Sequence, residues 1–230
     1  MIFAGMVKSS LIDYPGKIAT VLFTPGCNYN CFYCHNRAII EDIDVLLDPT
    51  EVDDFLLRRQ GLIDAIVVSG GEPTLHRDLI PFLRKVKDLG YLTKLDTNGS
   101  NPDVLKKLID EHLVDYFAID YKAPVWRYGE ICGPDADGNV VLETLVMLLW
   151  AGVDFEARTT VVPQLTEKDL IRMAKEMPPL PRYVLNPYRK PKVYRPEDQA
   201  RIDIPPYPEK QIAKFAENIK LYQQNVVLMF

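Results

Sequence analysis

Three of the four cysteines in this 230-residue chain fall within eight residues, as Cys27, Cys31 and Cys34, with the spacing C-x3-C-x2-C. Thiolates this close together in a loop can converge on one metal centre. A structural zinc site closes its shell with four protein ligands, whereas a four-iron cluster held by three cysteines leaves one iron open. An open position can take up a further ligand and so become catalytic. The spacing therefore predicts a [4Fe–4S] cluster with one accessible iron.

Two other arrangements of these thiols are compatible with part of the pattern. His35 could complete a zinc site, but it directly follows Cys34, and adjacent residues rarely reach the same ion. The cysteines could also be buried free thiols, but Pro25, Gly26 and Asn28 indicate a loop instead of a core strand. Both arrangements therefore fit the pattern less well than the open cluster does.

Composition and charge exclude several classes of protein. The hydrophobic fraction of 47% and the charged fraction of 26% are typical of a globular protein. A net charge of −5 argues against a dedicated nucleic-acid binder. The chain has neither a run of ~20 apolar residues nor a signal-peptide pattern, so no membrane partner is expected. Clustered cysteines do not form a disulfide framework, and the expected location is a reducing cytoplasm.

Short apolar runs alternate with amphipathic patterns along the chain. Strands are expected at 18–24, 65–68, 91–96, 116–119, 155–162, 183–186 and 226–230. Helices are expected at 49–60, with Asp48 as the N-cap and Pro49 in the first position, and at 78–89, 102–112, 140–151, 167–177 and 209–224. The stretches 36–48, 121–139 and 187–208 are expected to be irregular.

This alternation predicts an α/β fold with a parallel sheet and right-handed crossovers. Six strand–helix units are too few for an eight-stranded barrel, so an open doubly wound sheet competes with a partial, open (β/α)6 TIM-like barrel. The count fits the partial barrel. We find no linker or internal repeat, and a single domain over residues 1–230 is expected.

In parallel α/β folds the carboxyl ends of the strands build the active site. The second expected strand is followed by Gly70, Gly71 and Glu72, where two glycines allow close backbone approach to a ligand and a carboxylate stands beside them. The same residues could form a simple strand-to-helix turn. The third strand is followed by Asp96 and Thr97, which could bind a ligand or cap the next turn.

The later strand ends also carry polar residues. Asp120 and Lys122 follow the fourth strand, and a buried aspartate there needs a partner. Arg158 lies inside the fifth strand, where it either pairs with Asp120 or Glu72 or steers a bound ligand. The sixth strand leads into Tyr188 and Arg189.

Cys132 and the histidines carry weaker signals. Cys132 lies far along the chain from the cysteine cluster, and a spare loop cysteine fits better than a fourth ligand or a redox group. His76 and His112 are expected on helix surfaces.

The cysteine spacing, with Tyr33 before the last cysteine, resembles the radical S-adenosylmethionine (SAM) superfamily. The segment 10–17 (SLIDYPGK), together with His35-Asn36 after the cysteines, more narrowly resembles the glycyl-radical-enzyme activases. The anaerobic ribonucleoside-triphosphate reductase activating proteins are the most similar group, and they are related to pyruvate formate-lyase activating enzyme. No further cysteines lie between Cys34 and Gly70, which favours these short types.

The resemblance implies a set of cofactor contacts. Cys27, Cys31 and Cys34 would hold the [4Fe–4S] cluster, whose open iron would chelate SAM. The Gly-Gly-Glu motif would hold the methionine ammonium. Asp96, Thr97 and Asp120 would contact the ribose and carboxylate of SAM, and in some activases two aspartates at these strand ends also bind a monovalent cation. Besides Gly70, Gly71 and Glu72 of that motif, the remaining expected cofactor-binding residues are Tyr33, His35, Tyr121, Lys122, Arg158, Tyr188 and Arg189, the last standing where some activases have histidine.

The implied reaction is reductive cleavage of SAM to methionine and a 5′-deoxyadenosyl radical, which abstracts hydrogen from a glycine of a partner enzyme such as anaerobic ribonucleotide reductase. Flavodoxin or ferredoxin is the implied electron donor. This chemistry requires no acid, base or nucleophile, so no catalytic residue is expected beyond the cluster ligands. Two alternatives stay open: a radical SAM enzyme acting on a small molecule or RNA, and a non-catalytic iron–sulfur or zinc protein. The motifs at successive strand ends argue against the second.

Overall fold

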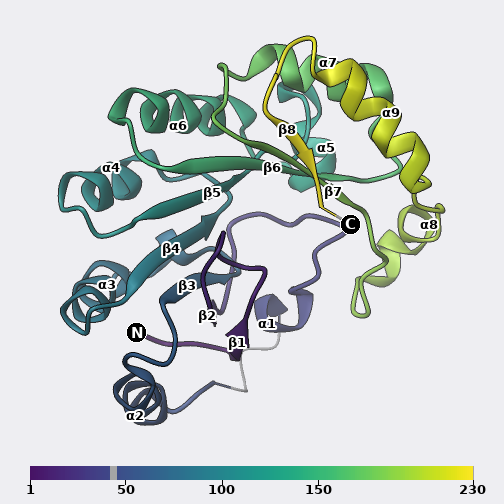
Figure 1. Cartoon of the computed structure of the whole chain (residues 1–230). Helices are drawn as coiled ribbons and strands as arrows, with labels where there is room; N and C mark the ends of the chain where they lie inside the picture. The colour runs from purple at the N-terminus through teal and green to yellow at the C-terminus, as the bar shows by residue number, and fades with distance from the viewer. Residues whose placement is uncertain (42–45, 230) are drawn as a thin grey trace. The chain divides into compact units, whose positions relative to one another are not determined.

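The computed structural model describes residues 1–41 and 46–229. Within them, one sheet contains eight strands in chain order from β1 to β8, so β1 and β8 are its edges and the sheet is open (Figure 1). The expectation of an open α/β fold is confirmed. The strands are β1 (Gly5–Ser10), β2 (Ala19–Thr24), β3 (Ala65–Gly70), β4 (Leu92–Thr97), β5 (Tyr116–Asp120), β6 (Phe155–Val161), β7 (Tyr183–Pro187) and β8 (Val226–Leu228).

The helices lie between the strands, as the alternation predicts. They are α1 (Arg37–Glu41), α2 (Pro49–Arg59), α3 (Leu79–Asp88), α4 (Pro102–Asp110), α5 (Tyr128–Cys132), α6 (Gly138–Ala151), α7 (Glu167–Glu176), α8 (Gln199–Ile202) and α9 (Glu209–Ile219), with 3-10 turns η1 (Pro73–Leu75), η2 (Val125–Arg127) and η3 (Pro196–Asp198). The predicted cap of α2 is confirmed, because the Asp48 carboxylate accepts the Thr50 N–H at 2.8 Å and Pro49 is the first helical residue.

The parallel arrangement is confirmed for β2–β3, β3–β4, β6–β7 and β7–β8. The exception is β1, an antiparallel edge strand on β2 that the sequence did not predict. Its second half, Lys8 to Ser10, is polar and mostly exposed, so it lacks the apolar pattern of a buried strand.

The stretches expected to be irregular contain the short elements α1, η2, α5, η3 and α8. One or two turns are too short for helical periodicity to be read from sequence. Residues 42–45 of the stretch 36–48, and Phe230 of the last predicted strand, lie outside the described residues.

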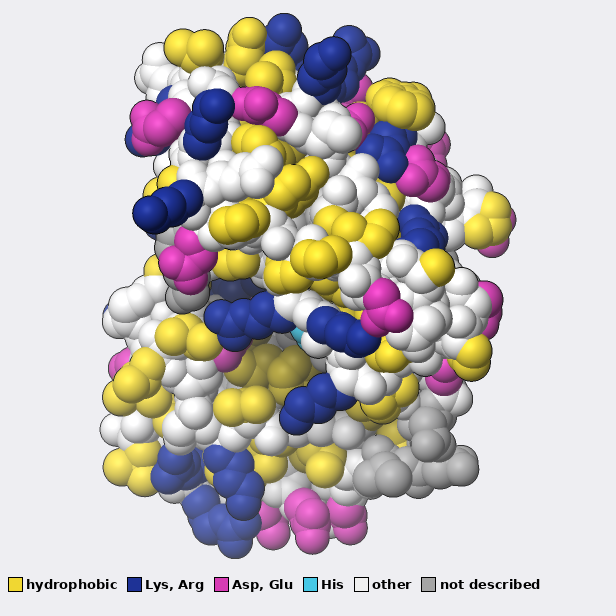
Figure 2. Space-filling view, turned by 90° about the vertical axis from the view of Figure 1, so that its right-hand side faces the viewer, with side chains coloured by type: hydrophobic (Ala, Val, Ile, Leu, Met, Phe, Trp, Pro, Cys, Tyr) yellow, Lys and Arg dark blue, Asp and Glu magenta, His cyan; other side chains and the backbone are white. Residues whose placement is uncertain are grey.

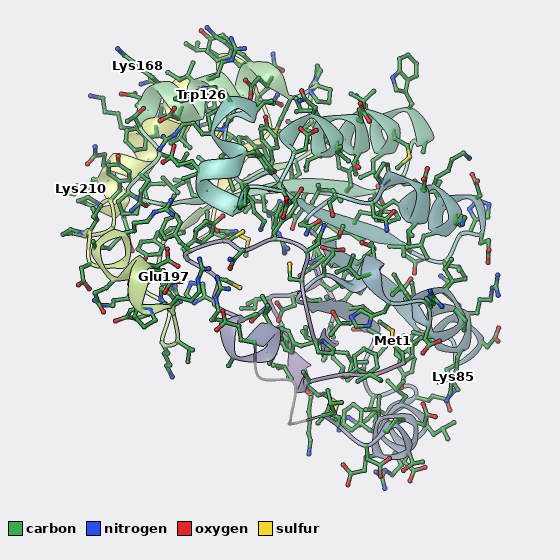
Figure 3. The ribbon with its side chains drawn as sticks, turned by 180° about the vertical axis from the view of Figure 1, so that it is seen from behind. Met1, Lys85, Trp126, Lys168, Glu197 and Lys210 are labelled. Carbon is green, nitrogen blue, oxygen red and sulfur yellow. The ribbon has the colours of Figure 1, made fainter. Side chains whose placement is uncertain are left out.

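The chain forms two compact units. The first consists of Met1–Cys27, Ala38–Thr97 and Asp103–Ala118. Its core includes alternating residues of β2 and β3, such as Val21 and Val67, packed against Tyr14. On its surface Lys85 of α3, labelled in Figure 3, forms an ion pair with Asp53 of α2 at 2.6 Å.

The second unit consists of Asn28–Arg37, Asn98–Pro102 and Ile119–Phe230. Helix α7 begins with a capping box in which the Thr166 and Asp169 side chains accept each other's backbone N–H groups. Helices α7 and α9 lie side by side (Figure 1). The buried Gln223 amide donates to the carbonyls of Ala174 and Pro178, each at 3.0 Å, and so joins the end of α7 to the turn after α9.

Charged side chains of both signs are interspersed with hydrophobic ones on the face shown in Figure 2. In residues 1–41 and 46–229, no helix combines the length and the apolar character that crossing a bilayer requires.

Candidate functional site

Two loops of the first unit are pressed together at the ends of β2 and β3. The Gly71 N–H donates to the Thr24 carbonyl and the Glu72 N–H to the Gly26 carbonyl, both at 2.8 Å. A Cβ on Gly71 would lie 1.7 Å from the Gly26 oxygen, and one on Gly70 would lie 2.2 Å from the Thr24 nitrogen. Only glycine permits this approach. The Gly-Gly-Glu loop therefore rests directly on the backbone that leads into the first cysteine.

Two further contacts fix the turn before Cys27. The His76 Nε2 lies 2.9 Å from the Pro25 carbonyl oxygen, and the Gly26 N–H donates to the Ile39 carbonyl at 3.2 Å. The expectation that His76 lies on a helix surface is wrong, because it follows the short turn η1 and faces the cysteine loop. No sequence signal marks this contact, since the two residues are 51 positions apart.

Glu72 is fully buried at the start of η1. Its Oε1 accepts hydrogen bonds from the Thr74 N–H at 3.1 Å, the Thr74 hydroxyl at 2.6 Å and the Thr97 hydroxyl at 2.6 Å. The structure thus brings two predicted site residues, Glu72 and Thr97, together across neighbouring strand ends. Hydrogen bonds to a carboxylate are strong and directional, so this group is held in one orientation.

Asp96 also has a partner within the first unit. The buried Lys94 ammonium donates to Asp96 Oδ1 and to the Asp13 carbonyl, both at 2.7 Å, and lies 6.0 Å from the centre of the Tyr116 ring. Lys94 therefore ties the loop between β1 and β2 to β4. Sequence reasoning missed Lys94, although a lysine inside a predicted apolar strand was the available signal.

In the second unit, the loop carrying Cys31 and Cys34 is shaped by a buried arginine. Arg37 Nη1 donates to the Asn30 side-chain oxygen at 2.6 Å, and its Nη2 donates to the Cys31 carbonyl at 2.5 Å. The Cys34 N–H donates to the same Cys31 carbonyl at 3.2 Å. Arg37 was not predicted as a site residue, yet it fixes the turn between the two cysteines.

The sequence indicated that Cys132 is a spare loop cysteine, and this interpretation is wrong. Cys132 ends α5, is fully buried, and its thiol forms a hydrogen bond with the Cys31 thiol. This hydrogen bond lowers the pKa of Cys31 to about 7, whereas burial raises the pKa of Cys132 and also that of Cys34. Because the thiolate is the form that binds metal, Cys31 reaches its ligand form most readily of these three.

The side chains around Cys34 belong to the second unit as well. Tyr33 is buried, burial raises its pKa, and its hydroxyl has no hydrogen-bond partner among the described residues. His35 forms a hydrogen bond with the Arg189 backbone, and burial lowers the pKa of His35. The Arg201 guanidinium of α8 stacks 3.8 Å above the Phe32 ring. The structure therefore brings His35 and Arg189 together.

The turn after β4 reaches the cysteine loop through two asparagines. Asn98 Nδ2 donates to the Asn28 side-chain oxygen at 2.9 Å, and Asn28 Nδ2 donates to the Ser100 hydroxyl at 2.9 Å. Asn98 also caps its own turn, because its side-chain oxygen accepts the Ser100 N–H at 2.9 Å. The cap observed in this turn is therefore Asn98, the residue after the predicted pair Asp96 and Thr97.

Asp120 pairs with two cations of the second unit. Lys122 Nζ lies 2.9 Å from Asp120 Oδ2, and Arg158 Nε lies 3.1 Å from Oδ1. Burial alone would raise the pKa of Asp120, but these two cations outweigh it and lower the pKa to about 2. The ion pair of Arg158 with Asp120, one of the two roles considered for Arg158, is present, and Lys122 shares the same carboxylate.

This ion-pair cluster predicts an acid-sensitive contribution to stability. The pKa of Asp120 is about 2 in the folded chain and ~3.9 when unfolded, so the stabilisation is complete above about pH 4 and is lost as the pH falls toward 2. We expect Asp120→Asn to lower the free energy of unfolding most above pH 4, with the difference from wild type shrinking below it. Denaturant unfolding between pH 2 and 6 measures this.

The matched control is Asp110→Asn, which breaks an exposed ion pair with Lys106 within α4. It should change the free energy of unfolding by less than about 1 kcal/mol at every pH. An Asp120→Asn difference that does not vary with pH would contradict the prediction.

Two predicted tyrosines direct their hydroxyls to partners in the second unit. Tyr121 donates to Glu176 Oε2 at 2.7 Å, and Tyr188 donates to the Ile202 carbonyl at 3.4 Å. Burial raises the pKa of both phenols, so both stay protonated. The proton of each phenol is therefore already donated within the second unit, and the oxygen can still accept a hydrogen bond.

The residues of the site fit an iron–sulfur cluster by their chemistry. Cys27 belongs to the first unit and Cys31 and Cys34 to the second, and all are free thiols, the ligands that such clusters take. Neither unit, in its described residues, gathers three His, Cys, Asp or Glu side chains into a ready metal site. In the second unit, the buried Tyr33 hydroxyl next to Cys34 has no hydrogen-bond partner among the described residues and offers a further contact to a bound group.

Comparison with known proteins places the chain in a family. The Radical SAM superfamily pattern matches residues 21–177. A protein of Methanocaldococcus jannaschii, provisionally named a glycyl-radical enzyme activating enzyme, is 35% identical over 234 residues, which cover 98% of this chain and 94% of that protein. The resemblance identified from the cysteine spacing is confirmed.

Solved structures show the same fold. SuiB of Streptococcus suis bound to SAM has a TM-score of 0.68 at 15% identity, covering 91% of this chain and 52% of SuiB. A domain of pyruvate-formate lyase-activating enzyme from Bacteroides vulgatus has a TM-score of 0.56 at 16% identity, covering 73% of this chain and 99% of that domain. The chain belongs to the radical SAM superfamily: it is a radical SAM enzyme with the open, partial-barrel α/β fold of that family, whose cofactors are a [4Fe–4S] cluster and SAM.

Proposed function

We propose that this enzyme installs a glycyl radical on a partner enzyme, such as anaerobic ribonucleotide reductase, with flavodoxin or ferredoxin as electron donor. The observation that carries the proposal is the match to the Methanocaldococcus jannaschii protein over 98% of this chain. That match runs through both units and is not confined to the segment around the cysteines. A single radical SAM domain over residues 1–230 is part of the proposal.

Cys27, Cys31 and Cys34 are proposed to hold the cluster, with the fourth iron left for SAM. When bound, this group supplies the electron that cleaves SAM to methionine and the 5′-deoxyadenosyl radical. The chain's own residues orient SAM and keep water away. Arg37 supports this role by fixing the backbone between two of the ligands.

Glu72 is proposed to accept the methionine ammonium of SAM. Its orientation is set by Thr74 and Thr97, and the absence of side chains at Gly70 and Gly71 lets the loop before it rest on the backbone of Thr24 and Gly26. The remaining proposed SAM contacts are Tyr33, His35, Asp96, Thr97, Asp120, Tyr121, Lys122, Arg158, Tyr188 and Arg189. No side chain is assigned as an acid, base or nucleophile.

A monovalent cation is not part of this proposal. Lys94 pairs with Asp96, and both Lys122 and Arg158 pair with Asp120. A bound cation would have to compete with these ammonium and guanidinium groups for the two carboxylates. Neutralising the aspartates requires no additional ion.

The role of Glu72 predicts a loss of SAM affinity in Glu72→Gln. A hydrogen bond between charged groups contributes about 1.5–3 kcal/mol, so the dissociation constant of SAM should rise roughly 10- to 150-fold. The glutamine keeps an oxygen for Thr74 and Thr97, which limits damage to the fold. Calorimetry on the anaerobically reconstituted protein measures the affinity. Glu51→Gln, at an exposed position of α2, is the control, and wild-type affinity in Glu72→Gln would contradict the assignment.

The proposed function is tested anaerobically in two steps. The protein is reconstituted with iron and sulfide, reduced with dithionite and mixed with SAM, and 5′-deoxyadenosine is expected in step with methionine. A glycyl radical enzyme from the same genome is then added, and electron paramagnetic resonance (EPR) should detect a glycine-centred radical. A partner with the target glycine replaced by alanine is the control. SAM cleavage without any glycine-centred radical would point instead to a small-molecule or RNA substrate.

A further inference from the structure

Cys132 is not among the proposed cluster ligands, yet it lies against one of them. It is fully buried at the end of α5, and its thiol forms a hydrogen bond with the thiol of Cys31. Its carbonyl accepts the Asn30 N–H at 2.7 Å. The next residue, Gly133, has φ +102°, and a Cβ there would lie 3.2 Å from Asn30 Cβ. The end of α5 is therefore fitted closely to Asn30, the residue before Cys31.

Cys31 is held from a second direction by Arg37, whose guanidinium bonds the Cys31 carbonyl and the Asn30 side chain. Arg37 thus fixes the main chain of Cys31, while Cys132 contacts its sulfur. The sulfur and the backbone of Cys31 are contacted by different residues. Mutation of Cys132 therefore tests the contact to the sulfur while the contact of Arg37 to the backbone is kept.

The direction of the thiol–thiol hydrogen bond follows from the chemistry of the pair. A cysteine that binds iron does so as a thiolate and carries no proton, so only Cys132 can then be the donor. A role as fourth ligand does not fit, because a fourth thiolate would close the iron that radical SAM chemistry leaves open. The remaining role is that of a donor to a ligand sulfur.

We propose that Cys132 is a positioning residue that donates an S–H···S hydrogen bond to Cys31 and raises the reduction potential of the cluster. The inference rests on the proposed role of Cys31 as a ligand. Reduction adds negative charge that the ligand sulfurs share, so a donor to one sulfur stabilises the reduced state more than the oxidised state. Hydrogen bonds to ligand sulfurs are a recognised control of cluster potential.

The test compares Cys132→Ala, Cys132→Val and Cys132→Ser with the wild type after anaerobic reconstitution. EPR-monitored redox titration without SAM gives the midpoint potential of each cluster. At a fixed solution potential, the ratio of reduced to oxidised cluster should fall on the order of fivefold in both apolar variants. The valine variant fills the space of the thiol, so the comparison does not depend on a cavity. The serine variant keeps a hydrogen-bond donor, so its ratio of reduced to oxidised cluster should lie close to that of the wild type.

The outcomes separate this inference from the proposed function. If the wild type takes up no cluster, or if Cys31→Ser keeps a full one, the ligand assignment fails. If all variants take up the cluster and either apolar variant keeps the wild-type potential, the role of Cys132 is overturned. The proposal would also be overturned if the serine variant lowered the midpoint potential as much as the apolar variants do, because a packing defect would then explain the change.

Discussion

Replacing Gly71 with alanine is expected to destabilise the first unit and to abolish most SAM cleavage. The added Cβ would lie 1.7 Å from the Gly26 oxygen and 2.5 Å from its carbonyl carbon, both backbone atoms that no side-chain rotation can relieve. Overpacking of this kind lowers the free energy of unfolding by about 1–3 kcal/mol or more. Because the displaced backbone leads directly into Cys27, a shift of about 1 Å should lower the rate of SAM cleavage roughly 100-fold.

The control for Gly71→Ala is Gly5→Ala in β1, in the same unit. A Cβ on Gly5 would make ordinary contacts with Phe23, at 3.7 and 4.0 Å. This variant should unfold at the wild-type denaturant concentration or slightly above it, because alanine is less flexible than glycine when unfolded. Wild-type stability and SAM cleavage in Gly71→Ala would show that the two loops do not depend on this close approach.

Replacing Cys31 with serine is expected to abolish cluster binding. Serine is a poor ligand for iron. The hydrogen bonds that Arg37 and Cys132 make to residue 31 cannot substitute for a thiolate. Iron and acid-labile sulfide should fall to background after reconstitution, with loss of the visible absorbance of the cluster. SAM cleavage should be lost with them.

Cys132→Ser is the matched control for Cys31→Ser, because it removes a thiol of the same unit and keeps all three proposed ligands. It should retain full iron and sulfide. A complete iron complement in Cys31→Ser would contradict the ligand assignment, and zinc in place of iron in the wild type would contradict the cluster itself.

The alternating strands and helices of the fold could be predicted from the sequence. Strand β3 begins with a continuous apolar run, and helices such as α2 carry a cap and a start signal, so local patterns identify them. Edge strand β1 and the short helix α5 have no such pattern. Their form depends on neighbours distant in sequence, such as the pairing of Met6 with Leu22.

The same distinction holds for the site. Motifs such as the cysteines and the Gly-Gly-Glu sequence are local and could be found directly, and the pairing of Arg158 with Asp120 was one of two expected outcomes. The contacts of Lys94 with Asp13 and of Cys132 with Cys31 join residues about 80 and about 100 positions apart. No spacing rule predicts such contacts, because only the folded chain brings these residues together.

The hydrogen bonds around Arg37 bear on how the cluster is acquired. Many small metal sites exist only after the metal has ordered the chain, so part of the binding energy is spent on folding. Here hydrogen bonds from Arg37 and within the backbone also hold the turn between Cys31 and Cys34, independently of any metal. Less conformational entropy is then lost when iron arrives. In this segment the protein is preorganised for assembly, and removing the cluster should leave the turn folded and ready to accept another.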